Sequence, residues 1–123
     1  MQVINLAAQF ARFSDHWSPR IAGELNGQHV KLVKALGEFD WHHHSDEDEL
    51  FLVVKGSFRM DYRENGEDKA KTVEEGEFVI VPRGIEHRPV AAEEVHILLF
   101  EPAGTLNTGN VRKTGGAQKG GSW

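Results

Sequence analysis

The chain has 123 residues, a length that suits one domain, and a formal net charge of −5. Nucleic-acid binding needs a concentrated basic surface, so we expect no nucleic-acid partner for this acidic chain. The absence of cysteine excludes disulfides, thiol nucleophiles and thiolate metal sites, so any metal must be bound by histidine and carboxylate side chains.

The N-terminal segment predicts a short helix followed by an arm, which together occupy residues 1–20. Leu6, Phe10 and Phe13 recur at helical spacing, and Asn5 is placed to cap the helix. The segment lacks the basic start, long apolar stretch and cleavage site of a signal peptide. No apolar run reaches the roughly 20 residues that span a bilayer. We therefore expect a cytoplasmic protein with no membrane partner.

From residue 21 to residue 103 the pattern changes to short strands separated by turns. The expected strands are 29–36, 38–44, two within 50–63 divided near Gly56, two within 71–84 divided near Gly76, and 94–102. Asn65-Gly66 is a hairpin signal, and Pro82-Arg83-Gly84 marks another turn. Many short strands with such turns are typical of an all-β barrel or sandwich.

The last segment, residues 104–123, is rich in glycine. Its apolar content is confined to a few residues, among them Leu106, Val111 and Trp123. We expect a mostly flexible tail that docks, if at all, near Leu106 and Asn107.

Three consecutive histidines are followed closely by a glutamate. Successive side chains of a strand alternate between faces, so His42 and His44 point one way and His43 the other. Glu49 reaches the same point if the residues between form a connection to the next strand. His87, just past a Pro-Arg-Gly turn, is the natural fourth ligand.

Three imidazoles and one carboxylate suit several divalent transition metals. Four protein ligands leave a position open only in five- or six-coordinate geometry, which favours Mn, Fe or Ni over a closed tetrahedral zinc site for chemistry. The expected cofactor is thus one divalent ion, with Zn, Mn, Fe and Ni left open.

These residues also stand at the spacing of two known motifs, and the sequence resembles the cupin superfamily. The first motif, usually G-x5-H-x-H-x3-4-E-x6-G, is matched at His42, His44, Glu49 and Gly56, with Gly37 one residue too close to His42. The second, G-x5-P-x-G-x2-H-x3-N, is matched at Gly76, Pro82, Gly84 and His87, with Ala91 in place of the final Asn. Since that Asn is not a metal ligand in the family, the four predicted ligands stand.

More narrowly, DELFLVVKG, VPRGIEHRPVA and FEPAGTLNTG resemble a group of small single-domain bacterial cupins, generically described as mannose-6-phosphate isomerase-like. The resemblance implies a double-stranded β-helix, or jelly-roll barrel, over residues 21–103. It also implies a homodimer, for which an apolar face carrying Phe39, Trp41 and Leu50 is a candidate, with Phe39 and Trp41 directed away from the metal.

Residues beside the predicted ligands are candidates for a substrate pocket. Phe51 and Val53 share the strand face of the predicted glutamate ligand and would line the cavity. Arg88 is a candidate contact for an anionic or polar substrate, although an exposed charge at the rim is an equal alternative. His96 lies in a buried strand, where both a core position and a pocket role are open.

Two functions are compatible with this pattern. The first is a metal-dependent small-molecule enzyme of isomerase or dioxygenase type, with metal-centred chemistry and no catalytic side chain identified. A sugar-phosphate substrate would need a basic pocket, and nothing in the sequence gathers the candidate residues Lys31, Lys34, Arg83 and Arg88. The alternative is a non-catalytic metal-containing module that binds or senses a small ligand.

Overall fold

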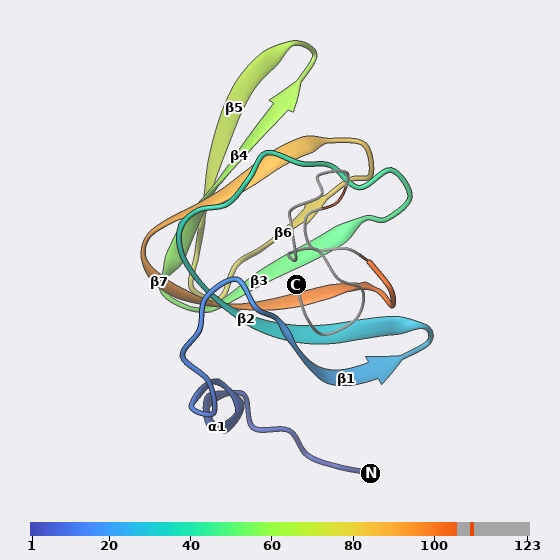
Figure 1. Ribbon diagram of the computed structural model, residues 1–123, viewed down its shortest axis with the longest axis vertical. Coiled ribbons are helices and arrows are strands. Elements are labelled where there is room, and N and C mark those ends of the chain that lie inside the picture. The colour runs from blue at the N-terminus through green and yellow to red at the C-terminus, as the bar shows by residue number, and fades with distance from the viewer. Residues whose placement is uncertain (106–108, 110–123) are drawn as a thin grey trace.

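A computed structural model of the chain describes residues 1–105 and Gly109 (Figure 1). The elements in chain order are α1 (Leu6–Phe10), β1 (Arg20–Leu25), β2 (Gln28–Glu38), β3 (Glu49–Lys55), β4 (Ser57–Glu64), β5 (Glu67–Glu74), β6 (Phe78–Val81) and β7 (Glu86–Pro102). The expected all-β fold with a short N-terminal helix is confirmed. The predicted flexible tail lies almost wholly outside the described residues.

Helix α1 forms where its capping residue predicts. The Asn5 side chain accepts a hydrogen bond from the backbone N–H of Ala8 at 2.8 Å, which satisfies one donor of the first turn. Phe10 is buried and stacks on the His96 ring of β7, with centroids 4.5 Å apart. The helix therefore covers the outside of the sheet beside β2 (Figure 1). No helix among residues 1–105 is long and apolar enough to cross a membrane.

The strands pair in the order β1-β2-β7-β3-β6, and β7 joins this set to the β4–β5 hairpin. The first part of β7 pairs with β4 from Glu86 to Val90, and its second part pairs with β3 from His96 to Phe100. Figure 1 shows β7 curving around the barrel while the β4–β5 hairpin projects from it. One long strand thus connects both parts of the barrel.

Cross-strand register places a set of apolar side chains on the inner face. Leu99 of β7 lies opposite Phe51 of β3 on one side and Lys31 of β2 on the other. The buried core is Val33, Ala35, Phe51, Val53, Phe58, Met60, Val73, Val81, Ala91, Val95, Ile97 and Leu99. Paired residues share a face, so Lys31 is directed inward with the core.

Two Asn-Gly turns set the hairpins. Asn65 and Gly66 have φ of 54° and 76°, the left-handed conformations that a two-residue hairpin turn requires, which confirms that prediction. Asn26 and Gly27 have φ of 51° and 76° and join β1 to β2 in the same way. In each hairpin the two strands therefore pair from the residues directly before and after the turn.

The structure differs from the sequence-based prediction at two of the expected strands. The predicted strand 38–44 is wrong, because β2 ends at Glu38 and the segment that follows makes only an isolated bridge between His42 and His87. The final strand begins at Glu86 rather than Glu94. It extends because β4 supplies pairing partners for its first residues, and a partner strand is not visible in a local pattern.

Candidate metal centre

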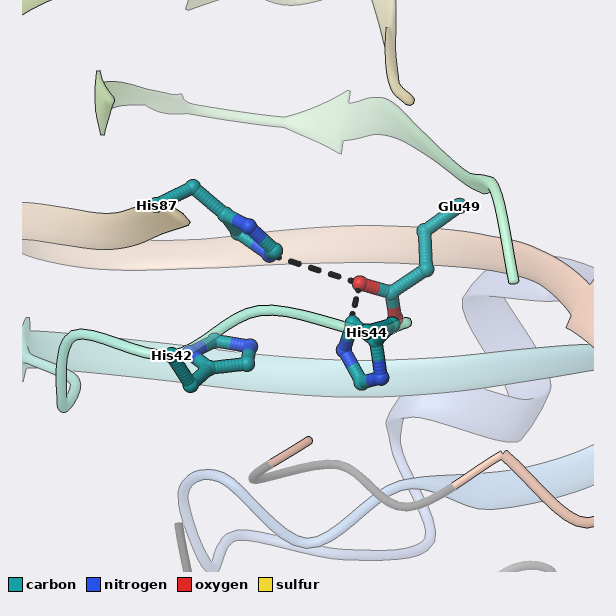
Figure 2. A group of neighbouring side chains, drawn as sticks. All are labelled: His42, His44, Glu49 and His87. Carbon is teal, nitrogen blue, oxygen red and sulfur yellow. Dashed lines mark ion pairs between the residues drawn. The ribbon is translucent and has the colours of Figure 1, made fainter. Parts of the chain in front are cut away.

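Four buried side chains from three parts of the chain converge on one point (Figure 2). His42 and His44 come from the loop after β2, Glu49 is the first residue of β3, and His87 lies near the start of β7. They are 2%, 4%, 4% and 1% exposed. Although the segment is no strand, His43 differs from the two predicted ligands beside it as expected, since it is only partly buried.

The ligand-type atoms of the four residues lie within 4.8 Å of one another. His44 Nε2 is 2.9 Å from Glu49 Oε1, and His87 Nε2 is 3.4 Å from the same oxygen. Figure 2 shows the carboxylate between these two rings, with His42 beside them. Such a cluster could hold one metal ion.

Backbone carbonyls orient two of the rings. His42 Nδ1 donates to Asp40 O and His87 Nδ1 donates to Ile85 O, both at 2.8 Å. A carbonyl only accepts, so Nδ1 carries the hydrogen and Nε2 retains its lone pair. This is the arrangement in which metal-binding histidines are commonly held.

Burial and neighbouring charges set the protonation of the cluster. Burial, together with nearby His87, lowers the pKa of His42 to about 4, so this imidazole is neutral near pH 7. Burial by itself would raise the pKa of Glu49, but His44 and His87 hold it below its usual range. A neutral imidazole and an ionised carboxylate are the forms that bind a cation.

The donor set fits a divalent transition metal. Three converging atoms, His44 Nε2, His87 Nε2 and Glu49 Oε1, are buried and make no hydrogen bond, although His44 Nε2 and Glu49 Oε1 are 2.9 Å apart. Buried polar atoms are normally satisfied, so these three need an explanation. A cation bound by nitrogen and carboxylate oxygen supplies one.

A narrow cavity adjoins the cluster. Its polar residues are His42, Glu49 and Glu101, and its apolar residues are Trp17, Val33, Phe39, Phe51, Pro89, Ile97 and Leu99. Its volume of about 20 Å³ holds little more than one water molecule. Trp17 and Phe39 of this wall are only partly buried, and their tilted rings lie with centroids 4.9 Å apart, so a larger ligand would have to displace side chains such as these.

The residues predicted to line the pocket have different places in the structure. Phe51 is in the cavity wall, whereas Val53 lies further along β3 in the core. Arg88 is directed away from the cavity and pairs with Asp61 at 2.9 Å, because successive β7 side chains alternate faces. His96 is also outside, stacked on Phe10. Of the predicted pocket residues, Phe51 is therefore the one that lines this cavity.

Two aromatic residues expected to share a face are separated. Phe39 lies in the cavity wall, with its ring edge-on to His42 at 5.3 Å. Trp41 instead packs under the guanidinium of Arg63, 3.9 Å from the ring centre. The chain leaves the sheet after Glu38, so strand alternation no longer governs these two side chains.

A buried contact between a lysine and a carboxyl group near the cluster was not predicted. Lys31 Nζ lies 3.5 Å from Glu101 Oε1, and the two side chains are 2% and 3% exposed. Burial and the carboxylate of Glu49 raise the pKa of Glu101 to about 9, against the attraction of Lys31. The signal was present in the sequence, since Glu101 shares the strand alternation of the buried residues Ile97 and Leu99.

The fold and the cluster together define a small barrel with a candidate metal site, and comparison with known proteins shows its family. The model of the cupin domain matches residues 29–101, more than half of the chain, so the protein belongs to the cupin family. The resemblance seen in the sequence is confirmed.

Three proteins illustrate the likeness. A cupin-2 domain containing protein from Shewanella frigidimarina NCIMB 400 is 43% identical with a TM-score of 0.77, over 81% of this chain and 94% of that chain. NMB1881 from Neisseria meningitidis is 31% identical with a TM-score of 0.73, over 83% and 100%. The uncharacterized protein YdbB of Bacillus subtilis (strain 168) is 35% identical over 65 residues, 53% of this chain and 55% of that protein. The chain thus spans about half the length of YdbB. The jelly-roll fold is confirmed.

A more distant likeness links the chain to an enzyme. Hydroquinone 1,2-dioxygenase from Sphingomonas sp. TTNP3, solved with 4-hydroxybenzoate bound, is 19% identical with a TM-score of 0.71. The match covers 80% of this chain and 31% of that chain. At this identity the likeness concerns the fold alone.

Proposed function

We propose that this cupin is a metal-dependent enzyme acting on a small, largely apolar molecule, of dioxygenase type rather than sugar-phosphate isomerase type. The observation that carries the proposal is the buried His42, His44, Glu49 and His87 cluster opening on an apolar cavity. The ion would be one of Zn, Mn, Fe or Ni. Its identity is left to measurement.

The basic residues of the described chain argue against a phosphorylated substrate. Phosphate recognition needs free cationic groups in the pocket. The four candidates have other partners: Lys31 pairs with Glu101, Lys34 donates to Phe13 O, Arg83 pairs with Asp48, and Arg88 pairs with Asp61. The apolar lining of the cavity favours an uncharged ligand instead.

Each part of the site has a role in this proposal. A bound cation would supply Lewis acidity and, if redox-active, would allow chemistry with dioxygen. Glu49 would serve as a ligand to the ion, so it is not available as a free base. Phe39, Phe51 and Trp17 would exclude water and orient the organic substrate against the cluster.

Metal analysis tests the proposal. Protein purified without chelator should retain about one equivalent of a transition metal, and His42→Ala should lose most of it because one ligand is missing. His43→Ala is the matched control, since His43 adjoins His42 on the chain but is outside the cluster, and this variant should keep the metal. Less than about a tenth of an equivalent in the wild-type protein would overturn the metal site.

Turnover separates the enzyme from the alternative binding or sensing module. Oxygen consumption and product formation would be measured with phenolic acids and diketones, and sugar phosphates would serve as the contrasting class. Oxidation of a phenolic acid or diketone supports the dioxygenase type. Turnover of sugar phosphates alone would contradict the proposed substrate class, and metal without any turnover would favour the binding module.

The homodimer and the cytoplasmic location are also proposed. The outer face of β6 carries Phe78 and Ile80, 60% and 53% exposed, beside partly buried Leu52 and Leu50 of β3. An apolar patch continuous across two strands is typical of an interface. We therefore expect the dimer to form through β3 and β6, not through Phe39 and Trp41.

A further inference from the structure

Glu101 is the polar residue of the cavity wall that is outside the predicted ligand set. Its Oε1 faces Lys31, and its second oxygen, Oε2, is buried without a hydrogen-bond partner. The wall is otherwise apolar apart from the metal ligands His42 and Glu49. Any organic molecule in this cavity therefore meets a single polar contact that is not also a candidate ligand of the ion.

Register explains why Glu101 lies at this position. Leu50 of β3 pairs with Phe100 of β7, so the next residues in each direction, Glu49 and Glu101, are cross-strand neighbours on the inner face. Lys31 enters the same face from β2, where it pairs with Leu99. The pair is thus built into three adjacent strands beside the metal cluster.

Stability does not account for such a pair. Replacing a buried ion pair with apolar side chains of similar volume is often neutral or stabilising. The Lys31–Glu101 distance of 3.5 Å is also long for a strong charge-assisted bond. An unsatisfied oxygen at the wall adds a further cost unless a ligand satisfies it.

We propose that Glu101, held by Lys31, is the binding group for a hydroxyl on the substrate, and that the substrate is a small hydroxylated aromatic molecule. This inference rests on the proposed function and names its substrate class. A hydroxyl both donates and accepts, so it suits a carboxyl oxygen in either protonation state. The aromatic walls of Phe39, Phe51 and Trp17 suit a flat ring.

Phenol and toluene test the inference, because they are similar in size and differ by a hydroxyl against a methyl group. Binding would be followed by NMR shifts of the Ile97 and Leu99 methyl groups in the cavity wall. Wild-type protein should bind phenol about tenfold more tightly than toluene, as one hydrogen bond to a buried polar group allows. Glu101→Leu combined with Lys31→Met should abolish this preference while leaving toluene binding, metal content and melting temperature unchanged.

Each other outcome counts against the inference. A preference that survives in the double variant would show that the metal, not Glu101, recognises the hydroxyl. Loss of metal or of folding in the double variant would assign a structural role to the pair. Glu101→Met then provides the second comparison, because it keeps the length of the side chain and removes both oxygens, and an unchanged phenol preference in this variant would overturn the inference.

The test is separable from the proposed function. The same titrations in protein dialysed against chelator report on Glu101 without any ion. If the wild-type protein purified without chelator holds no metal but still prefers phenol through Glu101, the metal-dependent enzyme is contradicted and the hydroxyl subsite is not. Full metal occupancy without any phenol preference would contradict the hydroxyl subsite and leave the metal site intact.

Discussion

At the scale of single residues, three buried acidic side chains differ in the direction of their pKa shifts because their neighbours differ. Glu49 faces two imidazoles and its pKa lies below the usual range. Glu101 faces the carboxylate of Glu49, and burial together with that charge raises its pKa to about 9. Asp61 lies between Arg59 and Arg88, and these guanidinium groups lower its pKa against the effect of burial. Burial alone therefore does not predict the charge of an acid in this barrel.

Asp61 provides a pH prediction. Its folded-state pKa lies below the unfolded value of 3.8, so its ionised form stabilises the fold above about pH 4. That stabilisation is lost as the pH falls through the folded-state pKa. Asp61→Asn should lower the free energy of unfolding by about 1–3 kcal/mol at pH 7, and the difference from wild type should narrow at pH 3. Urea unfolding of both proteins at pH 7 and pH 3 measures this difference in unfolding free energy.

The control is Asp68→Asn. The Asp68 side chain is 76% exposed and its pair with Arg63 is on the surface, so the substitution should leave the free energy of unfolding almost unchanged. An Asp61 deficit that is equally large at pH 3 would mean that the side chain acts through packing rather than charge.

At the scale of elements, helix α1 and the metal cluster lie on opposite sides of the sheet. Lys34 of β2 donates to Phe13 O at the outer face, whereas Lys31 and Val33 of the same strand face inward. The helix is thus attached to the barrel through residues that do not reach the cavity. Its removal should affect stability and not metal binding.

Phe10→Ala tests this separation. The side chain is 2% exposed and stacks on His96, so truncation should cost about 3 kcal/mol of unfolding free energy. Metal content should remain that of the wild type. Arg12→Ala, exposed on the turn that follows the helix, is the control and should change stability by less than about 0.5 kcal/mol. Metal loss in Phe10→Ala would show instead that His96 or α1 supports the cluster.

At the scale of the whole molecule, the apolar outer face of β3 and β6 predicts association. We expect light scattering to give about twice the chain mass of 13.8 kDa. Ile80→Lys should return the mass to that of one chain, because a charge in an apolar interface loses its hydration without a partner. Leu25→Lys, at a residue 50% exposed on β1, should leave the dimer intact. A single-chain mass for the wild-type protein would refute the dimer.

Local patterns were sufficient to predict much of this protein. Turn residues such as Asn65 and Gly66 specify a hairpin by their own conformational preferences, and helix capping by Asn5 is equally local. The spacing of His42, His44, Glu49 and His87 indicated the cluster before its geometry was known. The predicted separation of His43 from its neighbours agrees with its partial burial, although the segment is not the strand on which that prediction was based.

Tertiary structure alone decided which side chains share the cavity. Cross-strand register brings Glu101 beside Glu49 and Lys31. Phe39 enters the cavity because the chain leaves the sheet after Glu38. The physical reason is that a period-two pattern fixes a face within one strand, whereas the partner of that strand and their register depend on residues far along the chain.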